Sequence, residues 1–223
     1  MIFQKELISS LKGNGNEVAI SSGDERVRYS GLLTNSDKIT RFLLDNNTKK
    51  EAQVGVLSDD RIHMIISMIG IMNAGCVFVP IDGELPEKRL RSMKEDLDLE
   101  YILTSKGVAM PEALSSVKGT LVEDIMDGED YTGSIEYPEF QPDDSLYIYF
   151  TSGSTGRPKG VIGKNCSLLQ FLKWETTAFS VGPGNRFSQF ISPYFDAFLR
   201  DIFVPLLKGG TICIPPKEQD FFT

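Results

Sequence analysis

The sequence has few of the residues on which metal centres and disulfide scaffolds depend. Its 223 residues include three cysteines and a single histidine. Cys76, Cys166 and Cys213 lie far apart and lack the C-x-x-C spacing of zinc and redox sites. A small, odd number of dispersed cysteines is typical of a reducing compartment. We therefore expect a cytoplasmic protein without a disulfide framework.

An excess of positive charge is also absent. Lys and Arg total 23 against 31 Asp and Glu, which gives a formal net charge of -8 at pH 7. A broad electrostatic attraction to nucleic acid or to an anionic membrane surface is therefore not expected. Any anionic ligand must be bound by a local group of side chains and backbone amides.

No uninterrupted hydrophobic run is long enough to predict a membrane span. The longest apolar stretch, 62–81, contains a histidine, an asparagine, a glycine and a proline, and its last residues favour a strand. The N-terminal "MIFQKELISS" lacks the basic, apolar and small-residue regions of a secretory signal. We expect neither a membrane anchor nor secretion.

Strand and helix patterns alternate along most of the chain. We expect strands at 53–57, 76–80, 101–105 and 146–150, and helices at 60–74, 86–97 and 165–179. This alternation is typical of a mostly parallel sheet with flanking helices, and it predicts an α/β fold. The irregular residues 107–145 predict a soft subdivision of the chain.

Local signals give further boundaries. They predict a hairpin at 17–29, a helix capped by Ser30, a cap at Ser58 or Asp59, a strand within 119–125 and a helix from about Asp196. Trp174 and Phe179 are expected in the core, and His63, which has no nucleophile pattern around it, is expected to be structural.

The most informative segment is "YFTSGSTGRPKG", residues 149–160, directly after a predicted strand. Glycine-rich turns that leave a buried strand expose backbone amides to an anion, and hydroxyl side chains add further donors. One lysine supplies a compact positive charge behind a proline that stiffens the loop. The residues predicted to bind phosphate are Thr151, Ser152, Gly153, Ser154, Thr155, Gly156 and Lys159.

This loop differs from two common phosphate-binding patterns. The P-loop has Gly before its Lys and Ser or Thr after it, whereas Pro158 precedes Lys159 here and Gly160 follows. A Rossmann G-x-G-x-x-G at a strand-helix junction is absent as well. Composition alone leaves an ordinary surface turn or a flexible linker as an alternative.

Four segments together resemble the adenylate-forming superfamily, which includes peptide synthetase adenylation domains, acyl-CoA synthetases and luciferases. The phosphate loop within "LYIYFTSGSTGRPKG" resembles its phosphate-binding motif, and "VRYSGL" (27–32) resembles its first core motif. "IMNAGCVFVPID" (71–82) and "SPYFDAFLRDIFVPLLKGGT" (192–211) are most similar to adenylation domains of nonribosomal peptide synthetases. The similarity extends from about residue 15 to the C-terminus.

The resemblance implies an ATP-dependent ligase in the full-length parent. A substrate carboxylate would attack the α-phosphate of ATP to give an acyl-adenylate and pyrophosphate, and the phosphopantetheine thiol of a carrier protein would then take the acyl group. The expected partners are an amino acid and a peptidyl carrier protein or domain. The expected cofactors are ATP and Mg²⁺, with the Mg²⁺ ligands outside this chain.

The resemblance also assigns three residues to substrate binding. Asp196 matches the aspartate that pairs with the α-ammonium group of an amino acid, and Ala197 and Arg200 match positions that line the side-chain pocket. Two alternatives stay open, since Asp196 could cap a helix and could pair with Arg200 four residues later. An arginine that selects an acidic or polar substrate side chain is a hypothesis at this point.

The sequence departs from the family pattern in two places and ends early. Asn165 replaces a frequent histidine, and Phe198 replaces a frequent serine and predicts a bulkier pocket wall. The segments that stack adenine, bind magnesium and ribose, form the hinge and supply the C-terminal catalytic lysine do not occur in the 223 residues. We expect an incomplete N-terminal subdomain, 1–223, that contains no catalytic residue and is inactive alone.

Two other functions remain possible from the sequence. A non-catalytic nucleotide-binding or assembly module would retain the phosphate loop without the reaction. An acyl- or aryl-CoA ligase fragment would share the loop, although Asp196 disfavours it, because a carboxylate there would repel the carboxylate of a substrate that lacks an amine.

Overall fold

A computed structural model of the chain describes residues 1–128, 133–151 and 158–216. Its backbone contacts divide the chain into two compact units. The central unit comprises residues 35–166, and the terminal unit comprises residues 1–34 together with residues from 167 onward. Helix α2 (Tyr29–Asp45) begins in the terminal unit and continues into the central one. The two units are described separately.

The central unit is built on a six-stranded sheet with the order β6-β5-β3-β4-β7-β8. The strands are β3 (Gln53–Leu57), β4 (Val77–Pro80), β5 (Leu99–Thr104), β6 (Lys118–Leu121), β7 (Ser145–Thr151) and β8 (Lys159–Lys164). Neighbouring strands from β6 to β7 pair in parallel, and β8 pairs antiparallel to β7. The predicted mostly parallel α/β fold is therefore confirmed.

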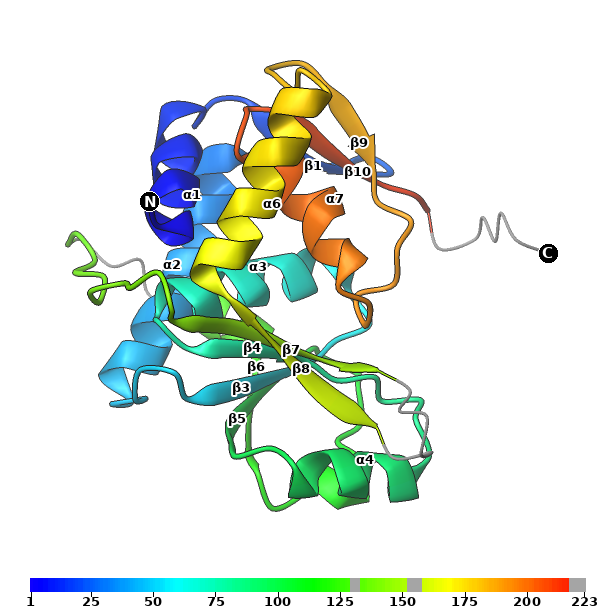
Figure 1. The fold of residues 1–223 in the computed structure, drawn as a ribbon. Helices are drawn as coiled ribbons and strands as arrows, with labels where there is room; N and C mark the ends of the chain where they lie inside the picture. Colours follow the sequence, from blue (N-terminus) through cyan, green and yellow to red (C-terminus); the bar gives the residue numbers. More distant parts are fainter. Residues whose placement is uncertain (129–132, 152–157, 217–223) are drawn as a thin grey trace. The chain divides into compact units, whose positions relative to one another are not determined.

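Helices of the central unit lie on both faces of this sheet. They are α3 (Arg61–Asn73), α4 (Glu87–Glu95) and the short α5 (Val122–Met126), with the 3-10 turn η1 at Glu112–Leu114. Figure 1 shows α3 and α4 on opposite faces. The strand order explains this arrangement, because β3 to β4 and β4 to β5 step in opposite directions. The right-handed crossovers that are the rule between parallel strands then place the two helices on opposite faces.

Helix α3 is buried almost all round, which explains its long apolar sequence. Its residues from Met64 to Asn73 are all buried. At Gly70 a side chain would meet Ile39 of α2, because an added Cβ would lie 2.5 Å from the Ile39 Cβ. The apolar stretch is thus a core helix followed by β4. Within the described part of the chain, none of the helices combines the length and apolar character that a membrane crossing requires.

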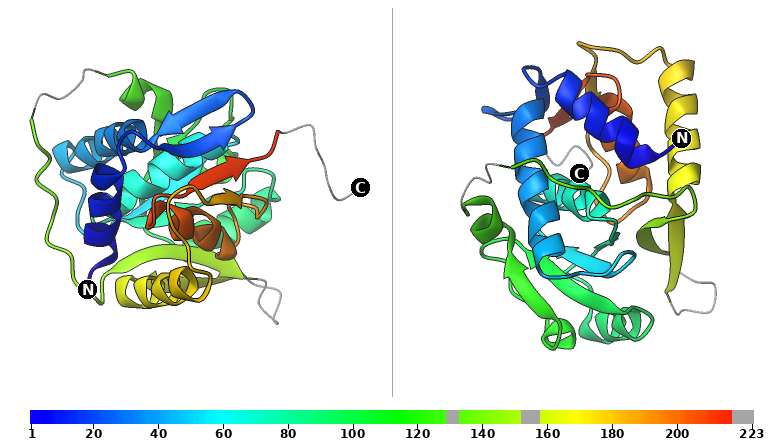
Figure 2. Two further views of the ribbon diagram at one scale, coloured as in Figure 1. Left: turned by 90° about the horizontal axis from the view of Figure 1, so that it is seen from above. Right: turned by 90° about the vertical axis from the view of Figure 1, so that its left-hand side faces the viewer.

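The terminal unit contains a four-stranded sheet with the order β2-β1-β10-β9. Its elements are α1 (Phe3–Gly13), β1 (Val18–Ser22), β2 (Glu25–Arg28), α6 (Asn165–Ala178), β9 (Arg186–Ser188), α7 (Ala197–Leu206) and β10 (Thr211–Ile214). Figure 2 shows the β1–β2 hairpin beside β10 from the other end of the chain, and β1 and β10 pair in parallel. The buried Tyr29 hydroxyl donates to the Gly210 carbonyl at 2.7 Å.

Several local predictions were wrong. Asp60 caps α3, with its carboxylate accepting the amides of Ile62 and His63, instead of Ser58 or Asp59. Helix α2 begins at Tyr29, so Ser30 lies inside it, and the strand expected over 119–125 ends at Leu121. Helix α1 and strand β8 had not been predicted. Trp174 and Phe179 are 61% and 68% exposed instead of lying in the core.

Candidate functional site

The β7–β8 hairpin carries both described ends of the predicted phosphate loop. Thr151 and Lys159 are register partners at the end of the antiparallel pair, followed inward by Phe150 and Gly160. The Thr151 hydroxyl donates to the Lys159 carbonyl oxygen at 3.5 Å. The predicted residues between them, Ser152, Gly153, Ser154, Thr155 and Gly156, lie outside the described residues.

Strand alternation sorts the side chains of the hairpin between two faces. Thr151 and Lys159 share one face, and their inward neighbours Phe150 and Gly160 share the other. Both Thr151 and Lys159 are exposed. A hydroxyl donor and an ammonium group therefore stand side by side at the mouth of the loop. This pair is chemically suited to phosphate oxygens.

Glycine at position 163 allows the hairpin to form. The Tyr147 ring lies over its register partner Gly163, where an added Cβ would be only 1.8 Å from the ring's Cζ. The Tyr147 and Tyr149 rings, 5.6 Å apart and close to perpendicular, continue this face of β7. An aromatic ring packed across a strand glycine is a recognised way to fix strand register.

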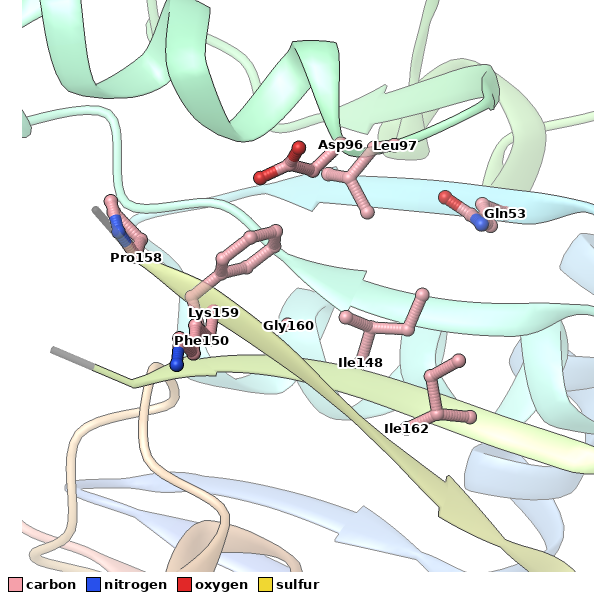
Figure 3. Close-up of a pocket in the computed structure, with 9 residues that line it drawn as sticks. All are labelled: Gln53, Asp96, Leu97, Ile148, Phe150, Pro158, Lys159, Gly160 and Ile162. Atoms are coloured by element: carbon pink, nitrogen blue, oxygen red, sulfur yellow. The ribbon is translucent and has the colours of Figure 1, made fainter. Parts of the chain in front are cut away.

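The opposite face of the hairpin borders a cavity of about 480 Å³ (Figure 3). Its apolar walls include Ile148, Phe150 and Ile162, and Asp96 and Gln53 add polar groups. Figure 3 shows the Phe150 ring pointing toward Asp96, whereas the Lys159 amine points away from it. Pro158, Lys159 and Gly160 also line this cavity, so it borders the described C-terminal end of the predicted phosphate loop.

The three predicted substrate residues lie together at the start of α7 in the terminal unit. Asp196 occupies the N-cap position, and Ala197 and Arg200 follow in the first turns; all three are exposed. The Asp196 backbone is already helical, at φ -60° and ψ -28°, and its side chain makes no capping hydrogen bond. The capping alternative for this carboxylate is therefore wrong.

Arg200 pairs with a residue that the sequence reasoning had missed. Its Nη2 and Nε lie 3.2 and 3.3 Å from Oδ1 of Asp201. The Asp201 side chain is only 8% exposed, against 47% for Arg200. Burial raises the pKa of Asp201, while Arg200 and the Ile191 backbone amide oppose that rise. A charged pair inside the apolar "FLRDIF" was the available sequence signal.

The two departures from the family pattern are both buried positions. Asn165 is fully buried at the start of α6, and its backbone amide donates to the Asp144 carbonyl at 3.0 Å. Phe198 is fully buried as well. The structure thus accounts for the bulk of Phe198 by packing, and a bulkier pocket wall stays a prediction.

His63 contacts Glu123 and not a catalytic or metal group. Its Nδ1 lies 3.3 Å from the Glu123 Oε1, which also accepts the Lys106 amide. No group of three or more His, Cys, Asp or Glu side chains suited to a metal occurs among residues 1–128, 133–151 and 158–216.

Comparison with known proteins decides the family. A family model described as AMP-binding enzyme matches residues 8–223. The chain belongs to the AMP-binding enzyme family. Adenylate-forming ligase chemistry is the property of the full-length members of this family.

Curated relatives of this AMP-binding chain are peptide synthetases. Gramicidin S synthase 2 of Brevibacillus brevis is 32% identical over 202 residues, covering 90% of this chain and 4% of the relative. HC-toxin synthetase of Cochliobolus carbonum is 34% identical over 214 residues, covering 92% of this chain and 4% of the relative. The chain thus spans about 4% of the length of these proteins.

A solved structure agrees on the fold. The N-terminal subdomain of Klebsiella oxytoca NpsA, in complex with 3-hydroxybenzoyl-AMSN, matches with a TM-score of 0.85 and 21% identity. The match covers 99% of the AMP-binding chain and 55% of the NpsA chain. The architecture is therefore that of an N-terminal subdomain of adenylate-forming enzymes.

Proposed function

We propose that these residues belong to an amino acid adenylation domain, as the first part of its N-terminal subdomain. In the full protein, an amino acid carboxylate oxygen attacks the α-phosphorus of ATP, the α,β-phosphoanhydride bond breaks, and pyrophosphate leaves. A carrier-protein phosphopantetheine thiol then attacks the acyl carbon and releases AMP. The sequence identity of 32% and 34% to two peptide synthetases supports amino acid activation over the activation of other carboxylic acids.

The phosphate loop, from Thr151 to Lys159, is proposed to bind the β- and γ-phosphates. Thr151 and Lys159 stand together at its mouth on one face of the hairpin. Their hydroxyl and ammonium groups would stabilise the negative charge that grows on pyrophosphate as it leaves. Ser152, Gly153, Ser154, Thr155 and Gly156 would add donors and close backbone approach. ATP would bring Mg²⁺, whose ligands we place outside this chain.

The assignment to amino acid activation rests on the exposure of the Asp196 side chain and on its lack of a capping hydrogen bond. This side chain is exposed at the N-terminus of α7 and makes no capping hydrogen bond. A carboxylate that caps no helix amide is suited to pair with the α-ammonium group of a substrate. Ala197 and Arg200 would border the substrate side chain. A fatty or aryl acid offers no cation to Asp196, so a CoA ligase is the less favoured alternative.

Amino-acid-dependent exchange of pyrophosphate into ATP tests this function. The protein, expressed to its natural stop codon, should exchange with at least one amino acid, and Asp196→Ala and Asp196→Asn should each lower kcat/KM by about a hundredfold. Asp24→Asn, which changes an exposed carboxylate in the β1–β2 turn, is the matched control and should retain full exchange. Full activity of both Asp196 variants would refute the assignment.

A non-catalytic nucleotide-binding module is the second candidate, and the same protein distinguishes it. Such a module would bind ATP without exchanging pyrophosphate for any carboxylic acid. Residues 1–223 alone are expected to show no exchange, since the family segments for adenine, ribose and the catalytic lysine do not occur among them. We further propose a cytoplasmic location, because the reaction consumes ATP.

A further inference from the structure

Asp201 is held more firmly than the exposed arginine beside it. Its carboxylate receives a hydrogen bond from the Ile191 backbone amide. The Ile191 carbonyl in turn accepts the side-chain amide of Gln189. Gln189 is fully buried, and its backbone amide donates to the Cys213 carbonyl of β10 at 2.8 Å. The buried carboxylate is thus connected to the sheet of the terminal unit.

This attachment gives Arg200 a defined position. Nε and Nη2 of the guanidinium both lie within 3.3 Å of one oxygen of Asp201. A guanidinium has five N–H donors, so donors on Nη1 and Nη2 remain for another acceptor. With 47% of its side chain exposed, Arg200 can present these donors outward from α7. The buried Asp201 carboxylate therefore orients the exposed guanidinium of Arg200.

The same pair changes the charge that a substrate meets. Asp201 compensates the positive charge of Arg200, and Asp196 one turn earlier adds a negative charge at the proposed ammonium site. The three groups together carry a net charge of about -1 when all are ionised. A substrate with a side-chain carboxylate would meet an arginine already paired with a buried anion. A neutral carbonyl oxygen would accept the remaining donors without that repulsion.

We propose that Asp201 is a positioning residue for Arg200, and that the pair selects an amino acid with an uncharged, hydrogen-bond-accepting side chain over one with a carboxylate. The proposal rests on the amino acid adenylation function proposed above. It narrows the substrate to the carboxamide class, as in asparagine, glutamine or larger side chains that present an amide carbonyl.

Pyrophosphate exchange by the full protein tests the proposal through two ratios of kcat/KM, glutamine over glutamate and asparagine over aspartate. In the unaltered protein at least one ratio should exceed about tenfold. Asp201→Asn keeps the shape of the side chain and removes its charge. The ratio of kcat/KM for the carboxamide over the carboxylate substrate should therefore fall about tenfold. Combined with Arg200→Ala, the Asp201→Asn change should leave the ratio of the single Arg200→Ala protein unaltered.

Glu6→Gln is the matched control. It neutralises a carboxylate that pairs with Lys173 at 3.0 Å in the same unit, and it should leave the ratio unchanged. A structural role of Asp201 would lower exchange with all substrates alike, whereas the proposed role changes the ratio between them. If Asp201→Asn unfolds the protein, the Arg200→Ala variant alone tests the proposal. In that variant the ratio of kcat/KM for the carboxamide over the carboxylate substrate must fall toward one.

Three results would overturn the proposal. They are a preference for carboxylate or apolar side chains in the unaltered protein, an unchanged ratio in folded Asp201→Asn or in Arg200→Ala, and the same shift for Asp201→Asn whether or not Arg200 is present. In each of them amino-acid-dependent exchange persists, so the adenylation function itself stands. Absence of exchange with every amino acid contradicts that function, and this inference with it.

Discussion

Thr151 and Lys159 face each other at the last rung of the β7–β8 hairpin, with the Thr151 hydroxyl 3.5 Å from the Lys159 carbonyl oxygen. The antiparallel pairing continues from there to Lys164 at the far end of β8. Strand geometry therefore fixes the two ends of the phosphate loop. Lys159 can act as a positioned cation because it belongs to a strand and not to a free turn.

Replacement of Lys159 should weaken the interaction with the phosphates. Lys159→Met keeps much of the length of the side chain and removes its charge, and we expect kcat/KM for ATP in pyrophosphate exchange to fall about tenfold to a hundredfold. Lys164→Met is the matched control in the same strand, where the amine donates to the Asp143 carbonyl at 2.8 Å. Equal losses in the two variants would show that the effect is on β8 and not on phosphate binding.

The contact between Tyr147 and Gly163 predicts a steric effect on stability. In Gly163→Ala the new methyl group would lie 1.8 Å from the ring, so the ring must move and the hairpin loses this packing. We expect the free energy of unfolding to fall by about 1 to 3 kcal/mol, measured by urea unfolding. Gly160→Ala meets its nearest atom, the Ile148 Cγ2, at 3.2 Å and should cost less. The reverse order would contradict the register described here.

Glu51 predicts a pH dependence of stability. Its carboxylate accepts the Ser145 amide at 2.8 Å, which holds the pKa of Glu51 below its ordinary value. The unfolded chain therefore binds this proton more readily, so the stabilisation is complete at neutral pH and disappears as the pH falls below about 4. Because solvent screens this exposed group, Glu51→Gln should lower the free energy of unfolding by less than about 1 kcal/mol at pH 7.

Urea unfolding at pH 7 and at about pH 3 measures the Glu51 effect. The difference between the unaltered chain and Glu51→Gln should be present at the higher pH and vanish at the lower one. Glu84→Gln, a change at another exposed glutamate of the central unit, should show no such dependence. If the two proteins still differ in the free energy of unfolding at about pH 3, the Glu51→Gln change destabilises the chain for a reason other than the lost charge.

The parallel sheet could be predicted because its strands and helices differ clearly in hydrophobic pattern. The β3-α3-β4-α4-β5 succession follows from short apolar runs and amphipathic or apolar helices, and the structure confirms it. Strand β8 could not be predicted in this way, since its residues are exposed except for Gly163. Its pairing with β7 is a tertiary contact that leaves little pattern along the sequence.

The errors at single residues have equally local causes. Ser58 and Asp60 are both good helix caps, and only the backbone geometry shows that the Asp60 carboxylate accepts two amides of α3. Trp174 is large and apolar, but it lies on the exposed side of α6, 6.3 Å from the Phe171 ring. Because α6 has apolar residues on both sides, composition alone does not predict which side of the helix is buried.

The substrate residues illustrate a different limit. The motif predicts Asp196, Ala197 and Arg200 as substrate-binding residues, and the structure places them together at the start of α7; their role stays a prediction. The charged pair within "FLRDIF" was a signal for Asp201, but the hydrogen bond from the Ile191 backbone amide, ten residues earlier, could not be inferred from spacing. The Arg200–Asp196 pair suggested by helical spacing is superseded by the neighbouring Arg200–Asp201 pair.

The central claim is that Asp196 binds the α-ammonium group of an amino acid. It is tested most directly by pyrophosphate exchange with the preferred amino acid and with the same carboxylic acid lacking the amine. The account predicts that the unaltered full protein favours the amino acid by about a hundredfold or more, and that Asp196→Ala loses most of this preference. Equal exchange with both acids, or a preference unaffected by Asp196→Ala, would contradict it.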